Sequence, residues 1–178
     1  MGGYNPDFSD ARIPLAYLLT FRCYGTWLHG DERGSTDRYQ NQYRTPFIPR
    51  NERWHNYNQH LLKHPPVELD AARRMAVEAA IRDTCDKRNW SLRAINVRTN
   101  HAHSVVTASC KPEPILSAFK ANATRQMREN GCWRYGYSPW ADKGSRRYLW
   151  TPHNVERAID YVLNGQGDAL PDFDDEEF

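Results

Sequence analysis

The amino-acid sequence predicts an α+β domain in which helices pack on an antiparallel sheet. The chain has 178 residues, 39% of them hydrophobic, which is enough to bury one core. Segments with strand-like alternation and segments with helical periodicity are mixed along the chain, without an internal repeat. Two strand signals are separated only by a turn signal at Thr99 and Asn100, which indicates a hairpin. Together these observations favour an α+β sandwich.

The chain up to residue 97 holds two predicted strands, a long insert and a helix. Residues 13–28 are rich in leucine, aromatic and β-branched residues and predict a buried strand, strongest up to Tyr24. Residues 29–66 form an insert crowded with Gly, Pro, Asn, Arg and aromatic residues, in which we find no sustained period. The helix is predicted after Pro66, from apolar residues at positions 67, 69, 72, 75, 76, 79, 80 and 81. Residues 90–97 alternate between apolar and polar and predict the second strand.

The hairpin partner and a second helix follow. Residues 101–109 continue as a strand after the turn. A helix is predicted over 111–131, opened by Pro114 and closed by Gly131. The pattern therefore places another helix between two strands of the sheet.

A short strand and a last helix complete the domain. Residues 145–150 predict a short basic strand. Thr151 and Pro152 form a helix start, and Gly165 is the expected stop. The helix carries an apolar face that consists of Val155, Ala158, Ile159, Val162 and Leu163.

The charge of the chain is unevenly distributed. The net charge is +2, but the last eleven residues carry six acids and no base. The net charge of the rest of the chain is therefore about +8. Residues 1–12 are a polar lead-in, and residues 169–178 form an acidic tail. A basic body with an acidic tail fits a polyanionic partner, whereas a solvated tail is the simpler explanation of the acids.

The sequence also predicts a cytoplasmic location. The longest apolar run is far shorter than a membrane span, and no signal-peptide pattern opens the chain. The four cysteines are scattered without a CxxC pair, which is typical of reduced thiols.

Two histidines stand at alternate positions of the predicted strand that follows the hairpin turn. In a strand, residues i and i+2 share a face, so His101 and His103 are expected side by side, within reach of one ion or one phosphate. Such a pair also arises by chance, and two structural histidines are the alternative. A metal site needs a third ligand. Histidine with oxygen donors suits Mn or Mg with phosphate, or Zn, but no zinc motif is present.

The last helix carries polar groups near its end. Tyr161 is rotated by about 200° from Ile159 around the helix and is expected off the apolar stripe. Asn164 and Gln166 follow where the helix ends. A tyrosine at the rim and a polar helix end are the alternative explanation.

Together these segments resemble the single-tyrosine HUH (His–hydrophobic–His) transposases, of the IS200/IS605 type and the REP-associated type. The resemblance lies in "HAH" before an apolar strand, in the helix "LSAFKANATRQM", in "WADKGSRRYLW" and in the last helix with its Tyr and Gln. It covers residues 13 to about 168. It implies a ferredoxin-like HUH fold, with four to five antiparallel strands, packed helices and a C-terminal helix that bears the tyrosine.

The resemblance also implies a chemistry. His101 and His103 would bind Mg²⁺ or Mn²⁺, with Gln166 as third ligand and Asn164 in reserve. Tyr161 would be the nucleophile that nicks and rejoins single-stranded DNA at or near hairpins through a 5′-phosphotyrosine. One departure stands out, because the family places the amide four residues after the tyrosine, where this chain has Gly165.

Two rival functions remain at this point. A replication-initiator or relaxase-like HUH nickase would share the chemistry without transposition. A domesticated module would bind single-stranded or hairpin DNA without cleaving it. Members of the family act as monomers or as homodimers with exchanged helices, so the sequence leaves the assembly open.

Basic and aromatic residues provide candidates for DNA contacts, because bases stack on aromatic rings beside a positively charged groove. In the insert, the alternative is that the aromatic residues pack against the rest of the domain and do not contact DNA. The predicted contacts are Arg33, Arg38, Tyr43, Arg44, Arg50, Arg53 and Trp54 in the insert and Lys120, Arg125, Arg146 and Arg147 beyond it. No membrane partner and no nucleotide cofactor are expected.

Overall fold

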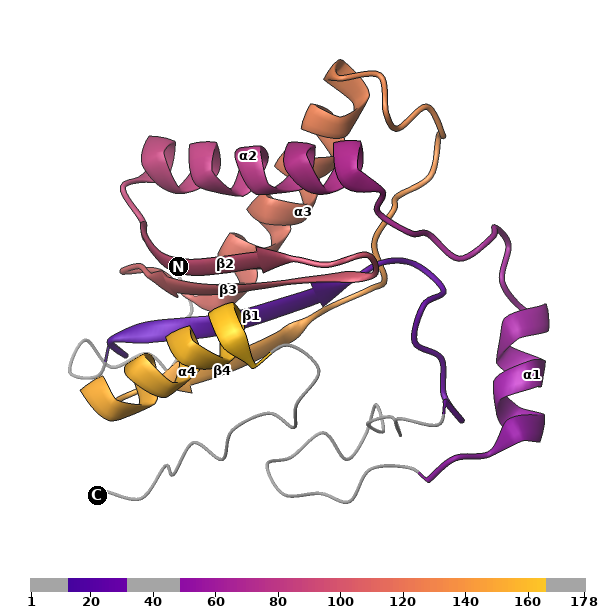
Figure 1. Ribbon diagram of the computed structural model, residues 1–178, viewed down its shortest axis with the longest axis horizontal. Coiled ribbons are helices and arrows are strands. Elements are labelled where there is room, and N and C mark those ends of the chain that lie inside the picture. Colours follow the sequence, from indigo (N-terminus) through magenta and orange to yellow (C-terminus); the bar gives the residue numbers. More distant parts are fainter. Residues whose placement is uncertain (1–12, 32–48, 166–178) are drawn as a thin grey trace, which may run out of the picture.

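The fold is built on a four-stranded antiparallel sheet, seen edge-on in Figure 1. The computed structural model describes residues 13–31 and 49–165. The strand order is β2-β3-β1-β4, and every neighbouring pair is antiparallel. This order, with helices between β1 and β2 and between β3 and β4, is the ferredoxin-like arrangement. The strands are β1 (Ala16–Arg22), β2 (Ser91–Val97), β3 (His101–Thr107) and β4 (Ser145–Leu149).

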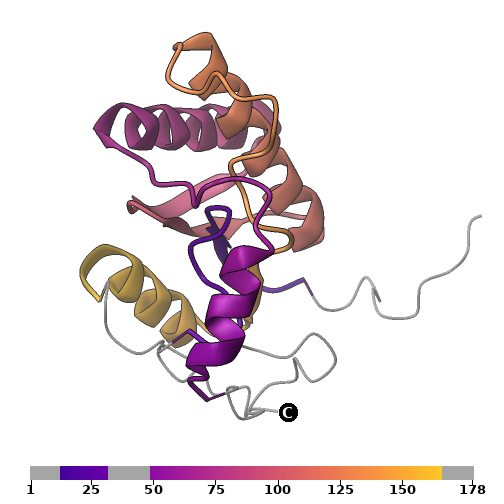
Figure 2. The same ribbon diagram turned by 90° about the vertical axis from the view of Figure 1, so that its right-hand side faces the viewer.

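Helices cover both faces of the sheet, as Figures 1 and 2 show from two directions. Helices α2 (Ala71–Arg88) and α3 (Pro112–Glu129) pack together on one face, and α4 (Pro152–Asn164) lies on the other. A further helix, α1 (Glu52–His60), lies to the side of these layers. The predicted α+β class, the ferredoxin-like topology and the C-terminal helix that bears Tyr161 are thus confirmed. Within the described residues, no helix is both long and apolar enough to cross a membrane.

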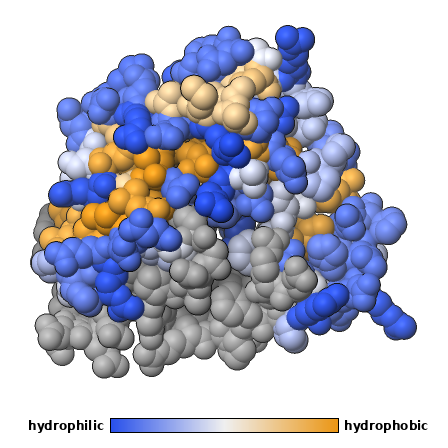
Figure 3. All heavy atoms as spheres, in the orientation of Figure 1, coloured by the Kyte–Doolittle hydropathy of each residue, from blue (hydrophilic) through white to orange (hydrophobic). Residues whose placement is uncertain are grey.

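The alternation of side chains along the strands divides the core into two clusters. Tyr17, Leu19 and Phe21 point from β1 toward α2 and α3, where they join the larger cluster. Leu18, on the opposite face of β1, joins the smaller cluster under α4. Between α2 and α4 a band of hydrophobic surface runs along the edge strand β2 (Figure 3), which carries the half-buried Leu92, Ile95 and Val97.

Helix α2 begins later than its apolar pattern predicts. Val67 and Leu69 belong to an extended segment and are buried in the core, so their spacing mimics a helical period. The Leu69 amide donates to Thr99 O at 2.6 Å, and the Val67 amide donates to Tyr24 O at 2.9 Å. The helix starts after Asp70, because its carboxylate accepts the Arg73 amide at 2.9 Å and caps the first turn.

Helix α1 lies inside the insert for which no regular element is predicted from the sequence. Asn51 caps it by accepting the Trp54 amide at 3.1 Å. None of its residues is buried, so no apolar stripe exists that a search for periodicity could detect. The expectation of a wholly irregular insert is therefore wrong for these nine residues.

Two predicted boundaries differ in smaller ways. Strand β1 ends at Arg22 rather than near 28, because the chain turns at Gly25, whose φ is +73°. Helix α3 opens at Pro112 rather than Pro114, and Pro112 occupies the first helical position, where proline is favoured. Helix α4 begins and ends as predicted, with the Thr151 hydroxyl accepting the Asn154 amide at 3.1 Å.

Candidate active site

The histidine pair lies on the inner strand β3, on the face covered by α4. The ring centroids of His101 and His103 are 4.6 Å apart, with the ring planes inclined at 74°. His103 is buried, with 7% of its surface exposed, whereas His101 is half-buried. The expectation that alternate positions would place the two imidazoles side by side is confirmed.

His103 is held neutral and fixed in orientation. Thr20, its partner on β1, places its hydroxyl oxygen 2.6 Å from His103 Nδ1. Burial lowers the pKa of His103 to about 3. His101 and the positive charges of Arg22 and Arg98 lower this pKa further in the same direction. At neutral pH the ring therefore carries no charge, which is the state that a metal ligand requires.

His101 is oriented by the residue before it. Its Nδ1 lies 2.5 Å from the side-chain oxygen of Asn100. An amide oxygen only accepts hydrogen bonds, so Nδ1 donates, and in a neutral ring Nε2 is the nitrogen that carries the lone pair a cation would use. The donor set of the pair thus suits a divalent metal ion.

Tyr161 lies beside the pair, on the last turns of α4. Its ring centroid is 5.5 Å from that of His103, at an interplanar angle of 74°. The tyrosine is half-buried. It follows Ala158 by three residues, which places the two side chains about 60° apart around the helix, so Tyr161 borders the apolar stripe. The expectation that Tyr161 lies off the stripe follows from its angle to Ile159, which is on the far side of the stripe.

Helix α4 is fixed to the sheet at the level of the tyrosine. The Asn96 side chain on β2 donates to Val162 O at 3.0 Å. Asn96 is also the register partner of His103. Ala158 and Val162 are fully buried against the strands beneath. The histidine pair and the tyrosine therefore belong to one packed unit.

The third ligand that the resemblance implies is not brought to the pair by the described residues. The Asn164 side chain is exposed and donates to Asp160 Oδ1 at 2.7 Å. Gln166 lies outside the described residues. In residues 13–31 and 49–165, no group of three or more His, Cys, Asp or Glu side chains could hold a metal.

Gly165 lies directly against the tyrosine. A Cβ atom at position 165 would stand 3.1 Å from Tyr161 Cδ2 and 3.2 Å from Tyr161 Cα, which is tighter than ordinary van der Waals contact. The φ of Gly165 is −93°, so the backbone does not require glycine here. It is the closeness of Tyr161 that leaves little room for a side chain.

The two predicted arginines of β4 point to opposite faces of the sheet. Arg146 forms an ion pair with Glu113 of α3, on the face away from the histidines. Arg147 pairs in register with Leu18 and shares the face with the histidines, where it is half-buried. Of the two, only Arg147 lies on the side of the candidate site.

Lys120 ties α3 to the loop before β4. Its ammonium donates to Ala141 O at 2.8 Å and also to Lys143 O. Burial lowers the pKa of Lys120, with a smaller opposite effect from Asp142. Two of its three N–H donors are thus used inside the protein.

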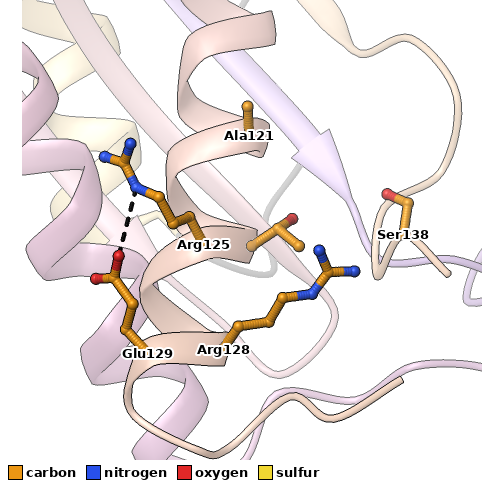
Figure 4. Close-up of a pocket in the computed structure, with 6 residues that line it drawn as sticks. Ala121, Arg125, Arg128, Glu129 and Ser138 are labelled. Atoms are coloured by element: carbon orange, nitrogen blue, oxygen red, sulfur yellow. Dashed lines mark ion pairs between the residues drawn. The ribbon is translucent and has the colours of Figure 1, made fainter. Parts of the chain in front are cut away.

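Arg125 lies at a pocket of about 450 Å³ on the outer side of α3 (Figure 4). Arg128 extends toward Ser138 across this pocket, whereas Arg125 turns the other way and pairs with Glu129 at 3.8 Å. Because α3 and the histidines lie on opposite faces of the sheet, this pocket is separate from the candidate site.

The predicted contacts of the insert are only partly described. Trp54 stacks on His29, with the ring centroids 5.3 Å apart, and keeps 39% of its surface exposed. Arg50 and Arg53 are exposed at the start of α1. The remaining four, Arg33, Arg38, Tyr43 and Arg44, lie outside the described residues.

Three residues of the site were missed from the sequence. Thr20 and Arg22 stand at alternate positions of β1, and Asn96 stands on β2. Their side chains reach the site only through the strand register, which no local pattern reveals. The one available signal was the polar character of positions 20 and 22 in an otherwise apolar strand.

The fold and the site together define a ferredoxin-like domain with a histidine pair facing a tyrosine helix. No family model and no curated protein matches the chain. Among solved structures, a REP-associated tyrosine transposase bound to a REP hairpin is 12% identical, covers 91% of this chain and 70% of that chain, and gives a TM-score of 0.49. A candidate transposase from Deinococcus radiodurans R1 is 12% identical, covers 95% of this chain and 100% of that chain, and gives a TM-score of 0.46. Likenesses of this size leave the function to be argued from the site.

Proposed function

We propose that this protein is a metal-dependent single-stranded DNA transposase that nicks and rejoins DNA at or near hairpins, in the cytoplasm. Tyr161 is the nucleophile, and His101 and His103 form the metal-binding pair. The observation that carries the proposal is the ring of Tyr161, 5.5 Å from that of a neutral, buried His103. A tyrosine and two imidazoles on one packed unit suit attack on a phosphodiester better than they suit a purely structural role.

In the proposed reaction, one bond at phosphorus replaces another. The Tyr161 hydroxyl loses its proton, its oxygen bonds to phosphorus, and the bond from phosphorus to the 3′ oxygen breaks. The 3′ oxygen leaves as a hydroxyl, and the 5′ phosphate stays on the tyrosine. Because the phosphotyrosine keeps the energy of the phosphodiester, a later 3′ hydroxyl can rejoin the strand without ATP.

A divalent cation fits the residues of the pair. His101 and His103 would hold Mg²⁺ or Mn²⁺ through their Nε2 atoms, with Gln166 or Asn164 as a further ligand. When bound, the ion would supply positive charge beside the phosphoryl oxygens. The chain itself orients both rings, through Asn100 and Thr20.

A second candidate is a domesticated module that binds hairpin or single-stranded DNA without cleaving it. The observation that favours it is at the end of α4, where Gly165 stands one turn after the tyrosine and Asn164 bonds to Asp160. An amide is therefore not held at the expected place by the described residues. A replication-initiator or relaxase-like nickase has no such specific observation in its favour.

The deciding experiment measures covalent protein–DNA adducts on a denaturing gel. Labelled single-stranded oligonucleotides with hairpins from the DNA flanking the gene are incubated with the protein and Mn²⁺, with and without EDTA. We expect a metal-dependent adduct that Tyr161→Phe abolishes while hairpin binding persists. Tyr148→Phe is the control, because Tyr148 stacks edge-on against Tyr17 on the other face of the sheet.

The alternative outcomes are equally specific. Binding without any adduct across several hairpins would favour the non-cleaving module. An adduct that survives Tyr161→Phe would assign the nucleophile to another residue and contradict the proposed site.

A further inference from the structure

Arg22 lies on the same face of the sheet as the histidine pair, across from His101. The register of β1 and β3 pairs Arg22 with His101 and Thr20 with His103. Residues opposite each other on antiparallel strands share a face. The hydrogen bond between Thr20 and His103 demonstrates that side chains from these two strands meet on this face. Arg22 is therefore the next side chain along β1 beside the candidate site.

The guanidinium of Arg22 is held over an aromatic ring. Its central carbon lies 3.2 Å from the centroid of the Trp27 ring. Trp27 comes back beside the strand because the chain turns at Gly25, and the Thr26 hydroxyl supports this turn by donating to Cys23 O at 2.8 Å. Stacking engages the flat face of a guanidinium, whereas its hydrogen bonds are donated in the plane. The side chain is thus preorganised before any ligand arrives.

The charges at this end of the sheet favour an anion. Arg22 and Arg98 are both near enough to lower the pKa of His103, whose own ring stays neutral. Arg98 is exposed at the hairpin, whereas Arg22 belongs to an inner strand and is half-buried. Of the two cations, Arg22 is the one fixed beside the histidines, opposite His101 on the neighbouring strand.

From this geometry we infer that Arg22 binds a non-bridging oxygen of the phosphodiester that Tyr161 attacks. The inference rests on the proposed function and adds a catalytic residue to it. Arg22 neither forms nor breaks a covalent bond and keeps its proton throughout. It donates hydrogen bonds to the phosphoryl oxygens as the bond from the tyrosine oxygen to phosphorus forms, and Trp27 acts as its positioning residue.

The first test compares rates of adduct formation in single turnover, with Mn²⁺ and saturating DNA. Loss of one preorganised donor to a developing charge slows a reaction by about 100-fold or more, so Arg22→Gln should slow adduct formation by that amount. Arg22→Lys keeps the charge without the planar fork and should slow it by about tenfold. Arg82→Gln is the matched control, because Arg82 pairs with Glu78 on the exposed side of α2, and it should react like wild type.

The second test measures binding alone, in EDTA so that no cation contributes to phosphate binding, and in a Tyr161→Phe background that cannot form the adduct. One oligonucleotide carries the native phosphate at the cleavage position found with wild type, and the other carries a neutral methylphosphonate there. With Arg22 present, we expect the methylphosphonate to bind about tenfold more weakly, as for the loss of one charged hydrogen bond. With Arg22→Gln in the same background, we expect the two oligonucleotides to bind equally.

The outcomes separate the two proposals. If the wild-type protein forms adducts and Arg22→Gln forms them at a rate within twofold of wild type, the role of Arg22 is overturned and the proposed function stands. The role of Arg22 is also overturned if the proteins with Arg22 and with Arg22→Gln prefer the native phosphate to the methylphosphonate by the same factor. Wild type that forms no adduct contradicts the proposed function and the inference with it. Thermal melts establish that the variants fold, and if Arg22→Gln does not, the slowing by about tenfold expected of Arg22→Lys in the first test decides.

Discussion

At the scale of single residues, His103 is the most constrained group of the site. It is buried, fixed by Thr20, and surrounded by a second imidazole and two arginines. All of these effects oppose protonation, and burial is the largest of them. A neutral imidazole in such a place is suited to bind a cation and unsuited to act as an acid at neutral pH.

This environment predicts a dependence of stability on pH. In the unfolded chain His103 takes up a proton near pH 6.5, whereas in the folded chain its pKa is about 3. Between these values the unfolded state binds more protons, so stability falls as the pH falls, by up to about 1.4 kcal/mol per pH unit from this group. Urea unfolding between pH 7 and pH 4, in EDTA, should give a shallower pH dependence for His103→Gln than for wild type.

The control for this prediction is His153→Gln, at an exposed position on the first turn of α4. It should keep the slope of wild type. Identical slopes for wild type and His103→Gln would mean that His103 is accessible to protons in the folded state.

At the scale of elements, Lys120 links α3 to the loop that leads into β4. Its two bonds to Ala141 O and Lys143 O hold this loop against the helix. Lys120→Met keeps the length of the side chain but leaves both carbonyls without this donor. We expect a loss of about 1–3 kcal/mol in the free energy of unfolding, as for charged hydrogen bonds, measured by urea unfolding.

A matched substitution exists on α2. Lys87 forms an exposed ion pair with Asp83 at 2.7 Å, one turn away on the same helix. Such pairs contribute little, so Lys87→Met should change the free energy of unfolding by less than about 0.5 kcal/mol. Equal effects of the two substitutions would reduce Lys120 to an ordinary surface lysine and make it available for phosphate contacts.

The helices and strands also show which parts of the fold could be predicted from the sequence alone. Strand β2 followed from alternation, strand β3 from the turn that precedes it, and helix α4 from its apolar face and the cap at Thr151, because these local signals agree with the packing. Helix α1 could not be predicted in this way, since none of its residues is buried. The start of α2 was misjudged because buried residues in an extended segment imitate a helical stripe.

The same limit applies to the site. The histidine pair and Tyr161 could be named from spacing and from the family resemblance. Thr20, Arg22 and Asn96 could not, because their places depend on which strands pair and in which register. Residues beside one another on a strand are readable from the sequence, whereas residues brought together by neighbouring strands are not.

At the scale of the whole molecule, helix α4 packs on the sheet of its own chain. The Asn96 side chain holds Val162 O, and the Tyr161 ring lies beside His103 of the same chain. This arrangement predicts that one chain carries the full histidine–tyrosine set. A mixture of His103→Ala and Tyr161→Phe proteins should therefore form no more adduct than the two variants separately.

A mixture of wild type with Tyr161→Phe serves as the control for that experiment. Its adduct should scale with the amount of wild type alone. Adduct formed only when the two defective variants are mixed would demonstrate that helices are exchanged between chains.

The unequal division of the core has a consequence for how this protein can evolve. The large cluster with α2 and α3 lies on one face of the sheet, while the histidines, Tyr161 and the small cluster lie on the other. Substitutions around α4 can therefore accumulate without removing the packing on which most of the fold depends. A lineage could lose the proposed cleavage, or change the DNA proposed as its substrate, and still inherit a folded domain on which selection can continue to act.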